Sequence, residues 1–89
     1  MNPLLAIDTV AEVTTARQFP LAPDSLLDES ISYDPVRDLN GNTVTIYPPD
    51  VVVIKRFLHD GYLCLCRFAG GPLCIIAASH LKPSEVKFS

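Results

Sequence analysis

The most reactive side chains in this sequence are three thiols and one histidine beside an acid. The thiols all lie within the apolar stretch "GYLCLCRFAGGPLCII": Cys64, Cys66 and Cys74. His59 precedes Asp60 in the turn "HDG" just before that stretch. Thiolates and imidazoles bind zinc, and they also act as nucleophiles or general bases. These residues could therefore form a metal site or a catalytic site, or they could simply be packed.

The cysteine spacing favours packing. Cys64 and Cys66 lie two residues apart in one predicted strand, which holds them about 6.5 Å apart in a geometry too constrained for a normal disulfide. A zinc site with His59 or His80 is an alternative, but structural zinc sites usually place Cys-x-x-Cys on a tight turn. A redox or catalytic thiol would need exposure and a nearby base. We therefore predict three small buried hydrophobic side chains, with no metal and no cofactor.

The histidine and acid in the turn allow two interpretations. Asp60 could orient the His59 imidazole for acid-base work. The simpler interpretation is that both residues face solvent at the tip of a hairpin. The sequence has neither a phosphate-binding glycine loop nor a Gly-x-Ser-x-Gly elbow. We find no enzymatic signature, and an enzyme of this size would have to build its site at a junction between subunits.

Length and charge limit the possible partners. The chain has 89 residues, enough for one domain without a large active-site cavity. Its net charge is -3, yet the charges are unevenly distributed: residues 1–50 hold eight acids and two bases, and residues 51–89 hold five bases and two acids. The acidic balance argues against a nucleic-acid partner. No apolar run approaches the ~20 residues that span a bilayer, no secretory signal is visible, and an odd number of cysteines fits a reducing cytoplasm.

The chain divides into two predicted parts. Residues 1–33 are expected to form an N-terminal arm or short helix, although β-branched residues there also alternate as in a strand. "PDSLLDES" predicts a turn of helix that begins at Asp24 or Ser25. Residues 34–89 are expected to form one small antiparallel β domain, in which Asn40-Gly41 joins a hairpin. Its later strands are predicted at residues 51–58, 62–68 and 73–79, followed by a helical turn and a closing strand in "HLKPSEVKF".

The stretch "PPDVVVIKRFLHDGYLCLCRFAGGPLCIIAASHLKPSEV", residues 48–86, resembles a Src-homology-3-like small barrel. The resemblance lies in strand lengths, in turn placement and in the "ASHLKP" step before the closing strand. It implies a mainly β fold, a five-stranded antiparallel barrel with an N-terminal arm. Peptide-binding members of that class use an acidic and aromatic cluster with a tryptophan, and this chain has no Trp. The resemblance therefore implies a fold and leaves function open.

A strand register follows from the turns. A two-residue Asp60-Gly61 loop places Lys55 opposite Cys66, and a Gly70-Gly71 loop places Cys66 opposite Ile75. Cys74 then points away from the other two thiols, although a change of one residue in the second loop would bring it to their face. The opposite sheet face would carry a second set of apolar residues around two arginines. That set comprises Val52, Ile54, Leu58, Leu63, Leu65 and Ile76, with Arg56 and Arg67.

This second face has to be covered, and three coverings are open. The acidic N-terminal arm could fold back, with Leu4, Leu5, Ile7 and Val10 on the apolar face and Asp8 or Glu12 near the arginines. A second copy of the chain could cover it, or a different partner could. We therefore predict a small binding or assembly module that forms a homo-oligomer, with a protein partner possible. The predicted contact residues are Arg56, Arg67, Leu65, Ile54, His59, Asp60 and Tyr62.

A nucleic-acid-binding barrel is the other alternative class. It would use a basic and aromatic strip to follow a phosphate backbone. The strip would consist of Lys55, Arg56, Arg67, Lys82 and Tyr62.

Overall fold

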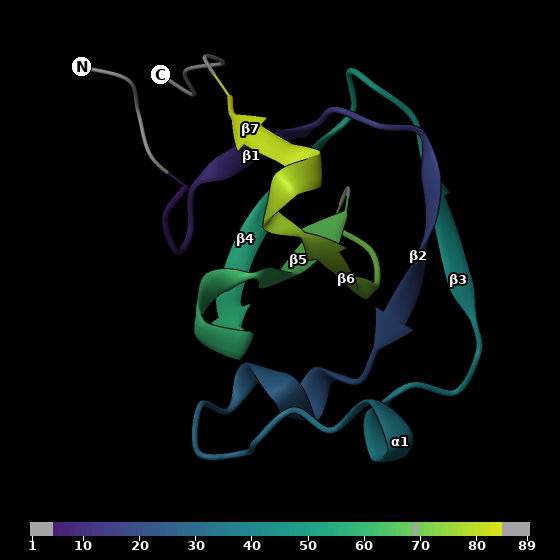
Figure 1. Cartoon of the computed structure of the whole chain (residues 1–89), viewed down its shortest axis with the longest axis vertical. Coiled ribbons are helices and arrows are strands. Elements are labelled where there is room, and N and C mark those ends of the chain that lie inside the picture. The colour runs from purple at the N-terminus through teal and green to yellow at the C-terminus, as the bar shows by residue number, and fades with distance from the viewer. Residues whose placement is uncertain (1–4, 69, 85–89) are drawn as a thin grey trace.

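The computed structural model describes residues 5–68 and 70–84. Within them, seven antiparallel strands form one sheet in the order β3-β2-β6-β5-β4-β1-β7 (Figure 1). The strands are β1 (Val10–Val13), β2 (Arg17–Ala22), β3 (Thr43–Ile46), β4 (Val51–Leu58), β5 (Leu63–Phe68), β6 (Leu73–Ala77) and β7 (Leu81–Pro83). Short helical turns lie between them: η1 (Asp24–Leu27), α1 (Pro35–Asp38), η2 (His59–Gly61) and η3 (Ala78–His80).

The fold is mainly β, as the sequence predicts, and its central strands lie where they were expected. β4 has the predicted bounds, and β5, β6 and the η3 turn before β7 match the predicted order. The number of strands differs from the predicted five because β1 and β2 arise from residues 1–33. The strand order has two ends, β3 and β7, so the sheet of the described residues does not close into the predicted barrel. Ala11 and Val13 are fully buried in β1, which pairs with β4 on one side and with β7 on the other. Burial of every second residue is typical of a strand, so residues 10–13 form a strand and not the expected arm or short helix.

The predicted hairpin at Asn40-Gly41 is absent from the described residues. The turn itself forms, with Gly41 at φ 86°. However, the residues before it fold into α1, where the Asp34 side chain accepts a hydrogen bond of 3.0 Å from the Val36 amide and Pro35 occupies the first turn. β3 therefore pairs with β2 in place of the residues just before the turn.

The register of the central strands differs from the predicted one at two points. A bulge between Ile54 and Arg56 puts Ile54, and not Lys55, opposite Cys66. In the next pair Cys66 lies opposite Cys74, and not opposite Ile75. The three cysteines consequently share one face, which is the alternative that the length of the second loop left open.

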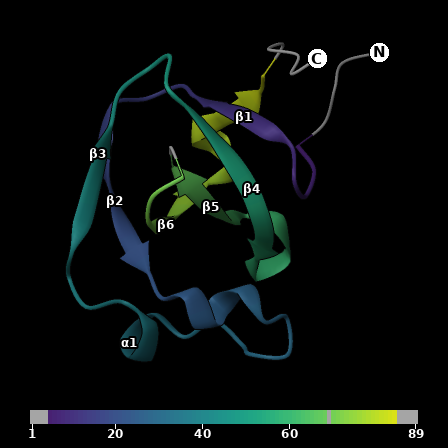
Figure 2. The same cartoon turned by 180° about the vertical axis from the view of Figure 1, so that it is seen from behind.

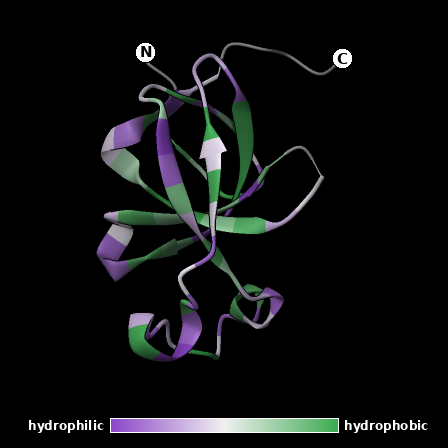
Figure 3. Cartoon of the chain, turned by 90° about the vertical axis from the view of Figure 1, so that its right-hand side faces the viewer, coloured by the Kyte–Doolittle hydropathy of each residue, from purple (hydrophilic) through white to green (hydrophobic). Residues whose placement is uncertain are grey.

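Two apolar clusters fill the molecule, one on each side of the central strands. The larger cluster contains the cysteines together with Ile54 and Ile76. The smaller one contains five buried residues: Leu26, Leu58, Leu65, Leu73 and Ile75. Figure 3 shows the hydrophobic strands crossing the middle of the molecule, with the η1–α1 segment below them.

The structure divides the residues of the predicted second face between the two clusters: Val52, Ile54 and Ile76 lie in the larger one with the cysteines, and Leu58, Leu63 and Leu65 lie in the smaller one. The face that carries the smaller cluster, which we continue to call the second sheet face, is covered from within the chain. Leu26 of η1 is fully buried in the smaller cluster, and Ile31, Tyr33 and Leu39 pack around it. The segment that follows β2 therefore covers this face, whereas Ile7, one of the residues expected to cover it, is 42% exposed. Leu4 lies outside the described residues, and Leu5 packs against the larger cluster. The uncovered face that motivated the prediction of a homo-oligomer is thus closed in a single chain.

Candidate functional site

The connection between β4 and β5 has an unusual backbone. Leu58 and Leu63 pair across it as predicted, with Leu58 buried. Between them His59, Asp60 and Gly61 all have positive φ, at 48°, 56° and 92°. Non-glycine residues rarely adopt this left-handed conformation, and consecutive ones are held only when the surrounding structure fixes them. The Tyr62 amide donates to the His59 carbonyl at 3.1 Å, and the Ala78 amide donates to the Tyr62 carbonyl at 2.9 Å, which ties the turn to η3.

Aromatic side chains gather at this turn. Tyr62 is 78% exposed although its backbone is anchored. The His59 ring contacts the ring of Tyr33 in an edge-to-face arrangement, with centroids 5.3 Å apart and planes at 75°. Tyr33 comes from the segment between η1 and α1, so the covering segment and the sheet both contribute. We call Tyr33, His59, Asp60 and Tyr62 the turn patch.

Negative charge surrounds the turn patch on the side of α1. Burial raises the pKa of Tyr33, and the negative charges of Asp38 and Asp34 raise it further. Hydrogen bonds from Arg37 and from the Asp34 amide lower the pKa of Asp38, so this carboxylate stays ionised. Arg37 forms an ion pair with Asp38 at 2.8 Å and offsets part of this negative charge. The carboxylates that remain beside the aromatic rings favour a cation over an anion.

Neither the turn patch nor the thiols have the geometry of a catalytic site. Within the described residues the His59 ring contacts Tyr33 and no side-chain hydrogen bond joins it to Asp60, so the acid does not orient the imidazole. All three cysteines are free and fully buried. Burial raises the pKa of Cys64 and Cys66 and raises the pKa of Cys74 to about 12, so the thiols stay protonated and unreactive at neutral pH. No cluster of three or more metal-binding side chains occurs in residues 5–68 and 70–84.

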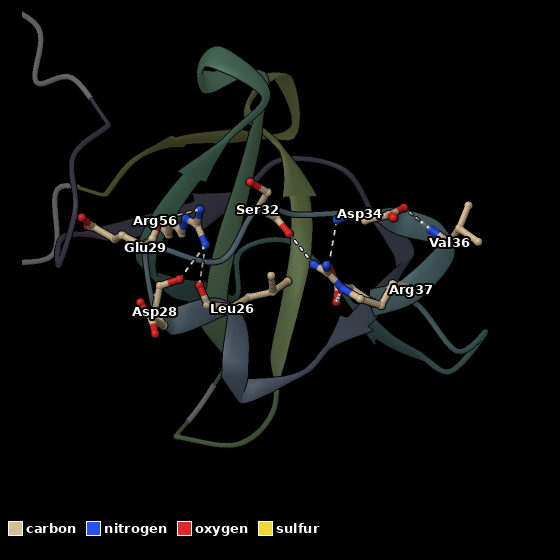
Figure 4. Close-up of polar contacts among 9 residues, drawn as sticks. Leu26, Asp28, Glu29, Ser32, Asp34, Val36, Arg37 and Arg56 are labelled. Atoms are coloured by element: carbon tan, nitrogen blue, oxygen red, sulfur yellow. Dashed lines mark hydrogen bonds and ion pairs between the residues drawn. The ribbon is translucent and has the colours of Figure 1, made fainter.

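Arg56, one of the predicted contact residues, binds the covering segment (Figure 4). Its guanidinium donates to the carbonyls of Leu26 at 2.9 Å, Asp28 at 3.2 Å and Glu29 at 3.4 Å. Leu26 belongs to η1, and Asp28 and Glu29 directly follow it. The Asp28 carbonyl also accepts from the Ile31 amide at 3.0 Å. An acidic segment does bind an arginine, as one of the predicted coverings had it. The contact, however, uses backbone carbonyls of residues 26–29 and not the side chains of Asp8 or Glu12.

The other predicted contacts on the second face are also engaged inside the chain. Ile54 and Leu65 are fully buried, in the larger and the smaller cluster respectively, so neither can touch a partner in this fold. Arg67 donates to the Gly71 carbonyl at 2.9 Å across the β5–β6 loop. Of the seven predicted contact residues, the structure brings His59, Asp60 and Tyr62 together at the surface and places the remaining four in structural contacts.

The basic strip considered for nucleic acid is likewise engaged. Lys55 binds Asp8 at 2.8 Å and Lys82 binds Glu12 at 3.0 Å, while Arg56 and Arg67 bind carbonyls. A phosphate backbone would have to compete with an acceptor at each of these cations, which weakens the electrostatic basis of that alternative.

Sequence reasoning missed Tyr33 as part of the patch. Tyr33 is remote from the "HDG" turn in sequence, and only the fold-back of the covering segment brings it to His59. The one local signal was its place between two acid-rich stretches, which does not specify a contact.

Comparisons with known proteins give no relative. No family model matches the chain, and no curated protein and no solved structure match it. In the described part of the chain, no helix has both the length and the apolar character needed to cross a bilayer.

Proposed function

We propose that this chain is a small binding module that takes a basic segment of a partner protein on the turn patch. The observation that carries the proposal is Tyr62: it is 78% exposed at the end of an anchored, left-handed turn that also holds Asp60 and His59, whose ring contacts Tyr33. An exposed aromatic ring with a fixed backbone gives contact area at low entropic cost, and Tyr is enriched among residues that dominate binding.

The chemistry of the patch favours a cationic ligand. A Lys or Arg side chain over the face of a tyrosine gains about 0.5–1 kcal/mol at an exposed site. The carboxylates of Asp60 and of Asp34 on the neighbouring segment add an attraction of the same sign. The negative charges of Asp34 and Asp38 help to raise the pKa of Tyr33, while the Arg37 guanidinium, paired with Asp38 at 2.8 Å, offsets part of that charge. An acidic ligand would meet repulsion there.

The proposed fold relation is a Src-homology-3-like arrangement with a long insertion between the first two core strands. Its support is the run of neighbours β7-β1-β4-β5-β6 and the η3 turn directly before the closing strand β7. The insertion would consist of β2, η1, α1 and β3. A reducing compartment such as the cytoplasm is proposed with it, on the support of three free thiols.

The test is a titration of the ¹⁵N-labelled chain with a tetra-arginine peptide, followed by amide chemical shifts. The expected shifts centre on residues 59–63 and on Tyr33, and they shrink as salt is raised. Tyr62→Ala is expected to weaken binding about two- to fivefold, the factor that corresponds to the loss of one cation–aromatic contact. A tetra-glutamate peptide is expected to leave the spectrum unchanged.

Tyr47→Ala is the matched control, because Tyr47 is 61% exposed and lies outside the turn patch. It should bind the tetra-arginine peptide as the wild type does. Shifts spread evenly over the acidic surface, or equal affinity in Tyr62→Ala and wild type, would remove the turn patch as the binding site.

A further inference from the structure

β3 ends the strand order on one side of the sheet, and it lies at the outer limit of the molecule (Figure 2). It is bound on one side only, by β2. The backbone groups on the other side of a terminal strand are free to pair with a further strand. Which strand can pair with this edge therefore depends on which residues of β3 direct their amides and carbonyls outward.

The ladder between β2 and β3 identifies those residues. The Leu21 amide donates to the Asn42 carbonyl at 2.9 Å, so residues 21 and 42 form a hydrogen-bonded pair. Antiparallel pairs alternate between hydrogen-bonded and non-hydrogen-bonded positions, which makes Phe19–Val44 the next bonded pair. The amides and carbonyls of Thr43 and Thr45 consequently point away from β2. No backbone hydrogen bond among the described residues uses them outside that ladder.

This edge lacks most of the usual protection against pairing. Natural edge strands carry charged residues, prolines or bulges, or they are very short. β3 is short, with the four residues TVTI, but it has no charge, no proline and no bulge in its pairing with β2. The opposite end strand, β7, has the sequence LKP: it has three residues and includes both a lysine and a proline. One end of the sheet is protected and the other is open.

We infer that the open edge of β3 pairs with β3 of a second copy of this chain, antiparallel and about a two-fold axis at Val44. In this register Thr43 of each chain lies opposite Thr45 of the other, and both amides and both carbonyls of each strand find partners. A two-fold contact of this kind closes at a dimer and does not propagate into a fibre.

The flanks of β3 fit the same register. Tyr47, which is 61% exposed, lies opposite Gly41 of the second chain, where its ring covers backbone that carries no side chain. A register shifted by one bonded pair would place Thr43 opposite Tyr47, whose carbonyl already accepts from the Asp50 amide at 2.9 Å. The Val44 axis is therefore the better match. Since so few backbone pairs form, the dimer should be a weak one.

The experiment is absolute mass by light scattering over a concentration series that reaches about 1 mM, where an association of about 4 kcal/mol is half complete. The wild-type mass should rise above the 9.7 kDa of one chain. Thr43→Lys with Thr45→Lys should stay monomeric, because the register sets lysine against lysine. Thr43→Glu with Thr45→Glu should stay monomeric for the same reason, and an equimolar mixture of the two variants should associate again.

Rescue by mixing separates loss of the contact from damage to the fold. The matched control is Ser25→Lys with Ser32→Lys, an equal change of charge at two exposed serines that lie outside β2 and β3, which should associate as the wild type does. Tyr62→Ala should also associate normally, so this inference and the proposed function can fail separately. A wild-type mass of one chain at every concentration overturns the inference, and so does a mixture of the lysine and glutamate variants that stays monomeric.

Discussion

Cys66 and Cys74 face each other in the ladder between β5 and β6, and both are fully buried with Cys64. Sequence spacing was enough to predict buried cysteines, because thiols in the middle of apolar strands have the packing behaviour of small hydrophobic side chains. Whether Cys74 shares a face with the others was not predictable. It depends on one residue in the loop after β5, and a shift of one residue reverses a whole strand face.

The thiols should make the stability of the protein fall in alkaline solution. Burial raises the pKa of Cys74 to about 12, whereas an unfolded thiol ionises near 8.5. Above about pH 8.5 the thiols of the unfolded state lose protons that the folded state keeps. The free energy of unfolding therefore declines by up to about 1.4 kcal/mol per pH unit for each thiol. Urea denaturation between about pH 7 and pH 10 measures this slope.

Cys74→Ala serves as the control for that slope. It removes one of the thiols and should make the decline with pH shallower, whatever its effect on stability at neutral pH. An unchanged slope in Cys74→Ala would mean that other groups, and not the buried thiols, cause the alkaline loss.

Arg56 joins the covering segment to β4, and so it acts at the scale of elements. It donates to three carbonyls at the end of η1 and the residues after it. Arg56→Ala should lower the free energy of unfolding by about 1–3 kcal/mol, since it leaves the partly buried Leu26 carbonyl without its donor. Arg17→Ala is the comparison, because the Arg17 side chain is exposed and makes one hydrogen bond, to His80. Equal losses in the two variants, measured by urea denaturation, would show that the Arg56 contacts are not structural.

The elements that sequence reasoning identified are those with local signals. β4, β5 and β6 are apolar runs separated by glycine-containing turns, and η1 begins at an acid directly after a proline. α1 had such signals too, in Asp34 and Pro35, but the Asn40-Gly41 pair was given more weight. The partners of β1, β2 and β3 could not be predicted, because each pairs with a strand remote in sequence. The composition of the turn patch could not be predicted for the same reason, since Tyr33 lies beside His59 only because of those long-range pairings.

The uneven distribution of charge gains a structural explanation at the scale of the whole molecule. The acidic half of the chain folds over the basic half: Asp8 binds Lys55, Glu12 binds Lys82, and the end of η1 receives Arg56. The ion pairs are exposed and contribute little to stability individually. The larger contribution comes from burial of Leu26 and its neighbours over the second sheet face.

The central claim is that the segment after β2 covers that face from within the chain, and two adjacent leucines test it most directly. Leu26 is fully buried, and Leu27 is 39% exposed in the same turn. By urea denaturation, Leu26→Ala should lose about 2–5 kcal/mol and Leu27→Ala about 0.5 kcal/mol or less. A Leu26→Ala loss no larger than that of Leu27→Ala would contradict the claim and leave the second face to another cover.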